Sequence, residues 1–134
     1  MGSFSDWAEG AILDHVFKTA AMSQPTNLYI ALCKSTIAED DTGSTLPTEV
    51  SGGDYARKVC NTWDACSGAG ATENSQVVTF AQATADWGVV TDFAVLDHSS
   101  TGHLIAYGKL NTTKNVQSGD TAKFATGDID ITLD

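Results

Sequence analysis

The strongest constraint on the fold is a series of short apolar runs, separated by turn residues, from residue 50 to residue 134. Glycine, serine and aspartate punctuate these runs at 67–70, 99–102 and 118–120. Such residues favour turns because they accept positive φ or hydrogen-bond their own backbone. Short runs with this punctuation are typical of a sandwich or jelly roll. They predict strands at Tyr55–Cys60, Gln76–Ala81, Val89–Asp97, His103–Leu110, Thr121–Ala125 and Asp128–Leu133.

The N-terminal part of the chain predicts one helix, over 3–18. Ser3 followed by Asp6 is a helix-start pattern, since the hydroxyl can accept an orphan backbone N–H and the carboxylate favours the positive helix end. We expect the helix to pack on the core through one face; docking on a neighbouring subunit is the alternative. The residues that recur at helical spacing on that face are Phe4, Trp7, Ala8, Ala11, Ile12, His15 and Val16.

The segment from Asn27 to Cys33 is apolar on both sides and predicts a central strand. Ser35–Gly53 is then a polar connection too long for a hairpin. Two interpretations of this connection stay open: a partner-binding surface or inter-subunit arm, and a mobile acidic loop. Together these patterns predict a mainly β protein, with residues 1–134 as one domain. Its helix lies at 3–18, and an antiparallel β-sandwich or jelly roll occupies 27–134.

Charge excludes one class of partner. Seven basic residues against 17 acidic ones give a formal net charge of −10, which repels phosphate backbones. We therefore expect no nucleic-acid binding. No apolar run approaches the roughly 20 residues that cross a membrane, so no membrane partner is expected. Gly68-Ala69-Gly70 lacks the third glycine and the helix of a phosphate-binding loop, so no cofactor is expected.

Residues that carry chemistry are sparse, and the chain is not expected to be an enzyme. No G-x-S-x-G elbow occurs, and Cys60 and Cys66 have no neighbouring histidine in the sequence. A small hydrolase is the alternative, and it would need a cleft that brings acid and base groups together. A metal site is also conceivable, but the same residues are more simply a hydrogen-bonded turn. The residues in question are Asp92, Asp97, His98 and His103.

The three cysteines do not have the spacing of a zinc site or of a secreted disulfide framework. Cys33 ends an apolar segment and is expected to be a buried thiol. Cys60 and Cys66 flank a short loop, and sequence alone leaves open whether they form a disulfide.

Several stretches spread over nearly the whole chain carry a likeness to one group of proteins. They are 3–6, 13–15, 28–33, 50–57, 78–80, 85–91, 102–108, 118–121 and 129–134. In these stretches the chain resembles small virion proteins of tailed bacteriophages. Members of that family are often labelled tail fibre proteins, and some are similar to capsid decoration proteins. The resemblance implies a component of the phage particle, on the capsid surface or the tail, that is assembled in the host cytoplasm.

These observations predict a non-enzymatic virion structural protein that decorates and cements the capsid by binding the major capsid protein. Decoration is favoured because the chain is one compact domain without a repetitive shaft. The alternative is a tail fibre or tail-tip protein that binds a host receptor, with tail proteins as partners. A homo-oligomer, dimer or trimer, is expected. The predicted interface residues are Trp7, Ile12, Glu39, Asp40, Asp41, Trp63, Ile129 and Ile131.

Overall fold

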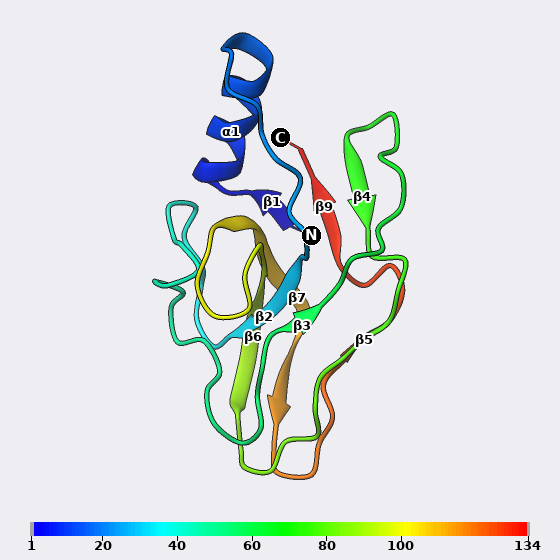
Figure 1. Ribbon diagram of the computed structural model, residues 1–134. Helices are drawn as coiled ribbons and strands as arrows, with labels where there is room; N and C mark the ends of the chain where they lie inside the picture. The colour runs from blue at the N-terminus through cyan, green and yellow to red at the C-terminus, as the bar shows by residue number, and fades with distance from the viewer. Residues whose placement is uncertain (1, 134) are drawn as a thin grey trace.

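The computed structural model describes residues 2–133, which form one N-terminal helix and a set of mostly antiparallel strands (Figure 1). The predicted mainly β fold with one helix is confirmed. In chain order the elements are β1 (Gly2–Phe4), α1 (Asp6–Phe17), β2 (Tyr29–Cys33), β3 (Lys58–Val59), β4 (Ala71–Glu73), β5 (Val78–Thr79), β6 (Gly88–Leu96), β7 (Leu104–Val116), β8 (Lys123–Phe124) and β9 (Asp130–Thr132).

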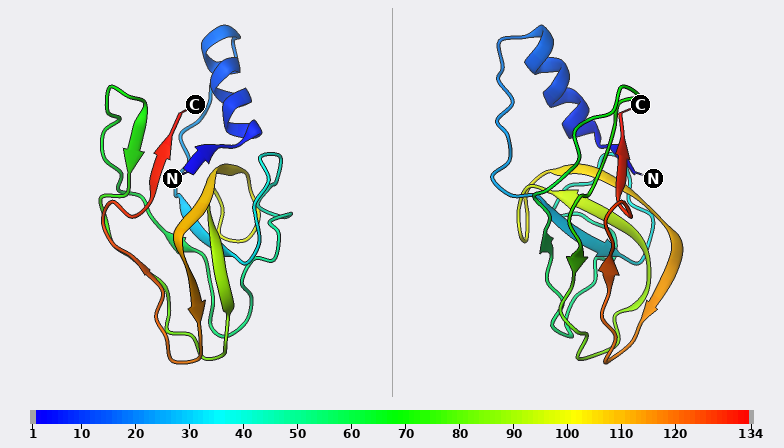
Figure 2. Two further views of the ribbon diagram at one scale, coloured as in Figure 1. Left: turned by 180° about the vertical axis from the view of Figure 1, so that it is seen from behind. Right: turned by 90° about the vertical axis from the view of Figure 1, so that its right-hand side faces the viewer.

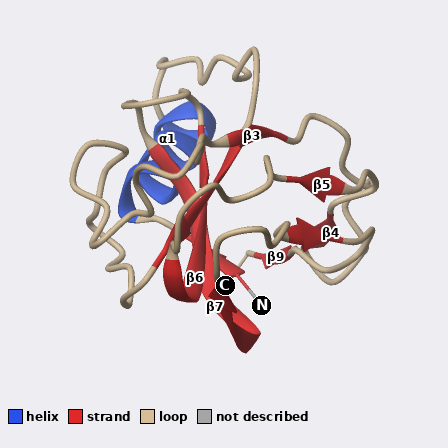
Figure 3. Cartoon of the chain, turned by 90° about the horizontal axis from the view of Figure 1, so that it is seen from below, coloured by secondary structure: helices blue, strands red, loops and turns tan. Residues whose placement is uncertain are grey.

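The strands form a curled seven-stranded sheet and a small two-stranded sheet. The order in the large sheet is β3-β2-β6-β7-β1-β9-β4, and β5 pairs with β8 in the small one. All pairs are antiparallel except β1 with β9, which run parallel. Seen from below, β6 and β7 cross the middle of the molecule, with α1 on one side and β4, β5 and β9 on the other (Figure 3). This arrangement is compatible with the predicted sandwich.

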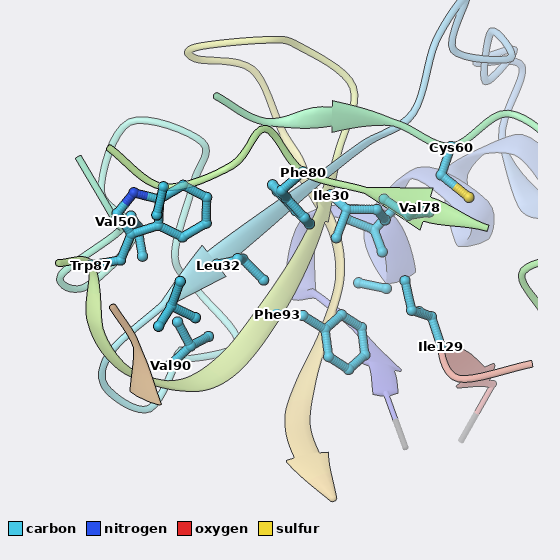
Figure 4. Packing of buried hydrophobic residues seen from close by; sticks show 14 of the residues in the cluster. Ile30, Leu32, Val50, Cys60, Val78, Phe80, Trp87, Val90, Phe93 and Ile129 are labelled. Carbon is cyan, nitrogen blue, oxygen red and sulfur yellow. The ribbon is translucent and has the colours of Figure 1, made fainter. Parts of the chain in front are cut away.

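The main core lies between the two sheets. Ile30 and Leu32 of β2 and Phe93 of β6 pack against Val78 and Phe80, which come from β5 and the residue after it (Figure 4). Phe80, Phe93, Phe124, Tyr55 and Trp87 make edge-to-face and stacked contacts with ring centroids 5.4–6.4 Å apart. These spacings fall in the range that aromatic pairs prefer. The core therefore joins the large sheet to the small one.

A second, smaller cluster covers the opposite face of the central strands. Ala31 and Cys33 of β2 and Leu96 of β6 alternate with the residues of the main core and pack around Ile37. Successive side chains of a strand point to opposite faces, so β2 and β6 are buried on both sides. This explains why the segment from Asn27 to Cys33 is apolar at nearly every position, as expected of a central strand.

The start of the helix differs from the prediction. Ser5, not Ser3, is the N-cap: its backbone is extended and its side chain accepts a hydrogen bond from the Ala8 N–H. Ser3 and Phe4 belong instead to β1, which pairs with Tyr107 and Ala106 of β7. A strand partner distant in sequence thus takes the residues that local pattern assigned to the helix.

Several strands are shorter than their apolar runs. Within the predicted runs Tyr55–Cys60, Gln76–Ala81, Thr121–Ala125 and Asp128–Leu133, the strands are limited to Lys58–Val59, Val78–Thr79, Lys123–Phe124 and Asp130–Thr132. β7 is longer than predicted and continues to Val116, because a large bulge lets it rejoin β6 beyond Leu110.

Within residues 2–133 there is no helix whose length and apolar character would let it span a bilayer.

Candidate docking surface

The helix α1 is attached to the body of the protein at its N-terminal end. The Ser5 N–H donates to the Ile105 carbonyl at 3.0 Å, and the Asp6 N–H donates to the Glu39 carbonyl at 3.1 Å. The Ser5 hydroxyl donates to the Leu104 carbonyl. Asp6 and Glu9 lie in the first turn, where carboxylates stabilise the positive end of the helix. These contacts fix the base of the helix to β7 and to the 35–53 loop.

An aromatic stack adds a side-chain contact at the same end. The Trp7 ring lies parallel to the His103 ring, with centroids 4.1 Å apart and an interplanar angle of 13°. His103 Nδ1 lies 2.8 Å from the Asp97 carboxylate, whose other oxygen accepts the His103 N–H at 2.7 Å. Asp97 therefore orients His103, and His103 holds Trp7 against the turn between β6 and β7.

Beyond its first turns α1 projects away from the sheets (Figure 2). Ala8 is its buried residue, whereas Leu13, Val16 and Phe17 are 56%, 63% and 80% exposed. These three residues are spaced i, i+3 and i+4 and so form one stripe, which we call the α1 stripe. On the face predicted to pack on the core Ala8 is buried, whereas Trp7, His15 and Val16 are exposed, so the prediction that this face covers the core is wrong for the single chain.

A cleft of about 610 Å³ lies beside the base of α1. Its walls are α1, the returning segment 20–23 and the Asp97–His103 turn. The Met22 N–H donates to His15 Nδ1 at 3.2 Å and ties the returning segment to the helix. Carboxylates of Asp6, Asp14 and Asp97 line the cleft, and no lysine or arginine is among the described residues that do so. The cleft therefore favours positively charged groups.

The predicted acidic residues of the long loop lie close to this surface. Asp6, Glu9 and Glu39 bring their carboxylates within 4.8 Å of one another at the base of α1. Asp40 is exposed, and Asp41 accepts the Ala38 N–H at 2.7 Å, which closes a turn. Trp7 and Glu39 of the predicted interface are therefore brought together, because the Asp6–Glu39 backbone bond joins their segments.

The loop itself is ordered around Arg57, a residue that sequence reasoning did not single out for this role. The guanidinium makes a two-pronged bond to Glu49, with both N–O distances 2.8 Å. It also donates to the carbonyls of Gly43, His98 and Thr101 at 2.7, 3.1 and 3.0 Å. Burial acts to lower the pKa of Arg57, but the bonds and charge of Glu49 outweigh it and raise that pKa. The loop is thus joined to the β6–β7 turn by one buried cation.

Other predicted interface residues lie elsewhere. Ile12 is half-buried on α1, and Trp63 is half-buried with its indole N–H donating to the Cys60 carbonyl at 2.8 Å. Ile129 and Ile131 are core residues, 0% and 5% exposed. Their side chains therefore do not belong to the surface of a single chain, and we do not include them in the docking surface.

The residues considered for chemistry make a structured turn. His98 Nδ1 accepts the N–H groups of Ser100 and Thr101 at 3.2 and 3.1 Å. Asp97 is bonded to His103, whereas Asp92 is buried, accepts the Thr91 hydroxyl at 2.6 Å and lies 3.7 Å from Lys109. Among the described residues these four side chains are not grouped at ligand distance from one another. The turn interpretation accounts for the hydrogen bonds of Asp97 and His98.

One comparison decides the family. Residues 3–132 match the family model described as Podophage GP4 fiber I protein gp80. The chain belongs to this fiber I family. The match spans nearly the whole sequence, so the resemblance to small virion proteins of tailed phages is confirmed. None of the curated proteins matches the chain.

Membership of the fiber I family supports a phage fibre-type structural protein with a place in the virion. It also favours a non-enzymatic role and interaction with other virion proteins. For a fiber I protein the relevant features are surfaces, and here the exposed apolar α1 stripe lies on the same helix that lines the acidic cleft. The signal that could have identified it is the sequence Ile12-Leu13 followed by Val16-Phe17, which is apolar around more than one helix face.

The three cysteines of this fiber I protein are free thiols in different environments. Cys33 and Cys60 are buried and Cys66 is exposed. Burial raises the pKa of the Cys33 thiol to about 12 and also raises the pKa of Cys60. Because the thiolate is the reactive form, the raised pKa makes both thiols less reactive, and their burial also keeps reagents away from them.

We therefore expect iodoacetamide to alkylate Cys66 alone in the native protein at pH 8, as measured by mass spectrometry of intact protein and peptides. The same reagent in urea should label all three thiols, which serves as the control. Native labelling of Cys33 at the rate of Cys66 would contradict the buried environment of β2.

Proposed function

We propose that this protein is a non-enzymatic fibre-type component of the phage particle that docks onto a neighbouring virion protein through the α1 stripe. The observation that carries the proposal is the exposure of Leu13, Val16 and Phe17 on a helix whose backbone is bonded to the sheet and the long loop at its N-terminal end. A helix that is apolar on its outer side is stable in solution but gains free energy when another surface covers it.

Charge supports a partner of defined chemistry. The cleft at the base of α1 presents three aspartates, and the chain carries a formal charge of −10. A partner with an apolar patch flanked by lysine or arginine would match both features. Complementary charge steers association and fixes orientation, while the covered apolar side chains supply most of the affinity.

We favour a tail location for this component, because the family name describes a fiber protein. Capsid decoration remains the second candidate. It is favoured by the way the described strands fold back on one curled sheet, without an elongated repeating element among residues 2–133. In both cases each copy would contribute modest buried area, and repeated copies on the particle would multiply the avidity.

Copy number in purified virions separates the two locations. Quantitative mass spectrometry and imaging of labelled protein should find a few copies at one vertex for a tail fibre component. Hundreds of copies over the head would establish decoration instead. Absence of the protein from purified particles would reject both.

Replacing the α1 stripe tests the docking surface itself. The triple variant Leu13→Ser, Val16→Ser, Phe17→Ser should fold normally, because these side chains are exposed in the single chain. We expect its incorporation into particles to fall by at least about tenfold in competition with wild type, because about 1.4 kcal/mol corresponds to a factor of ten and each removed side chain contributes about that or more when covered. The measurement is the ratio of variant to wild type in purified virions.

The matched control replaces exposed valines outside α1. Val77→Ser with Val89→Ser removes side chains that are 50% and 48% exposed, one just before β5 and one in β6. This control should enter particles as wild type does. Equal incorporation of the triple variant would mean that α1 is not the docking surface.

A further inference from the structure

A second cavity, of about 550 Å³, lies along the C-terminal half of β7 and is separate from the docking surface. Leu32, Val90 and Phe93 of the main core form its floor, and the partly buried Phe124 of β8 forms one wall. Sites of this size, with an apolar floor and a few converging polar groups, are where proteins most often bind small ligands. We call this cavity the β7–β8 groove.

A large bulge in β7 shapes the rim of the groove. Lys109 is opposite Asp92 and Lys114 is opposite Val90, so four residues of β7, Leu110–Thr113, stand against Thr91 alone. The extra residues carry Asn111 and Thr112 outward along the groove. Bulges of this kind bend a strand and re-aim side chains, and they are common beside functional sites.

The charges at the groove are unusual for this chain. Three of its seven basic residues, Lys109, Lys114 and Lys123, line the groove, although the chain as a whole carries −10. Lys109 donates to the Thr36 hydroxyl at 2.7 Å, so its ammonium already has a hydrogen-bond partner within the protein. Lys114 lies opposite the buried Val90, and directly opposed residues share a face of the sheet. Its side chain therefore lies on the face of the sheet that carries the floor residue Val90.

Two carboxylates also line the groove, but each is used in a turn. Asp120 accepts the Gln117 N–H at 2.9 Å, and Asp128 accepts the Ala125 N–H at 2.7 Å. Each carboxylate keeps its negative charge, so three lysines stand against two carboxylates at the groove. This balance is far less acidic than that of the whole chain, and Lys114 and Lys123 are the cations that an anionic ligand would meet.

We propose that the β7–β8 groove binds an anionic carbohydrate. Carboxylate groups of the sugar would pair with Lys114 and Lys123. The amides and hydroxyls that line the groove both donate and accept hydrogen bonds, as sugar hydroxyls do, and they are Asn111, Thr112, Asn115 and Thr121. The ring of Phe124 and the apolar floor would take the apolar face of a sugar ring.

An acidic peptide is the competing occupant, and the bulge disfavours it. A peptide added to a sheet edge needs the regular spacing of a straight strand. Four residues against one break that spacing where the groove is widest. The groove also lies toward the opposite end of the molecule from α1, which is at the top of Figure 1 while the turn after β7 is at the bottom. A copy docked through α1 would thus leave the groove facing outward.

This inference concerns binding by the isolated chain and does not depend on docking through α1, so the two can fail separately. The experiment uses the full chain and a tetramer of galacturonic acid, with the same tetramer methyl-esterified as the neutral control, in isothermal titration calorimetry. We expect saturable one-to-one binding of the acid at low ionic strength, and binding of the ester at least about tenfold weaker, because one lost charge-assisted bond is worth about 1.5–3 kcal/mol.

Lysine variants locate the site. The pair Lys114→Gln with Lys123→Gln should weaken binding of the acid at least about tenfold, by the same arithmetic. The pair Lys18→Gln with Lys34→Gln removes equal charge outside the groove and should leave binding unchanged. Three results would overturn the proposal: equal binding of acid and ester, an equal effect of both lysine pairs, or no heat with the acid while a Glu-Val alternating peptide binds.

Discussion

Replacing Arg57 with alanine is expected to lower the free energy of unfolding by about 3–5 kcal/mol, the usual cost of removing one partner from a buried ion pair. The Arg57 side chain is 3% exposed, and its loss would leave Glu49 without its cation. Three backbone carbonyls, of Gly43, His98 and Thr101, would also lose their donor. Urea unfolding followed by tryptophan fluorescence measures the change.

Two variants give this experiment its controls. Arg57→Lys keeps the charge but cannot make the two-pronged bond to Glu49, so it should recover only part of the loss. Lys18→Ala breaks the exposed Lys18–Asp14 pair, which has a 3.5 Å separation and a 73% exposed lysine, and should change stability by less than about 1 kcal/mol. A loss below about 1 kcal/mol for Arg57→Ala would refute its central role, since exposed pairs already reach that value.

The second large effect is expected at Asn74, which is fully buried between the strands of the C-terminal half. Its amide NH₂ donates to the carbonyls of Gln76 and Ala125 at 2.8 and 2.9 Å, and its oxygen accepts the Ile129 N–H at 2.8 Å. Asn74→Ala leaves the buried Ile129 N–H and the part-buried carbonyls of Gln76 and Ala125 without that partner. At about 1–3 kcal/mol for a buried group left unpaired, and less for a part-buried one, the loss should reach about 2–3 kcal/mol.

Asn74→Asp adds a pH dependence that a purely steric role would not produce. One oxygen of the ionised carboxylate would keep the Ile129 N–H, but the other would face the carbonyl oxygens of Gln76 and Ala125, so its pKa in the folded protein should be raised above the ordinary value. Stability is then greatest below the unfolded-state pKa of about 3.9 and falls as pH rises through the folded-state pKa. Urea unfolding between pH 4 and pH 8 measures this trend. Asn111→Asp, at an exposed position, is the control and should show little difference from wild type across that range.

The central strands could be predicted from sequence because local pattern decides them. The segment from Asn27 to Cys33 is apolar on both sides, and β2 is indeed buried on both faces. β4 was missed because Ala71-Thr72-Glu73 has neither apolar alternation nor β-branched residues beyond Thr72. It is a strand only because β9 pairs with it. The start of α1 was misplaced for the same reason, since β7 and β9 recruit Ser3.

The candidate surfaces also depend on contacts between residues distant in sequence, which local pattern does not predict. Exposure of Leu13, Val16 and Phe17 depends on where the rest of the chain lies, so an apolar helix was expected to cover the core. The roles of Arg57 and Asn74 rest on contacts up to 55 positions away in sequence, which no local pattern encodes. The sequence carries one sign of the β7–β8 groove, which is that Lys109, Lys114 and Lys123 all fall within the last quarter of an acidic chain.

The parallel pairing of β1 with β9 has a consequence for how the chain acquires its shape. Gly2 lies beside Ile131, and the Thr132 hydroxyl donates to the Gly2 carbonyl across 130 positions of sequence. The junction of β1 with β9 in the large sheet therefore stays incomplete on the ribosome until residues 130–132 have been synthesised. Contacts of such separation slow the search for the native state. We expect the edge of β1 that pairs with β9 to stay open until then, and full protection from proteases to arrive only after that pairing.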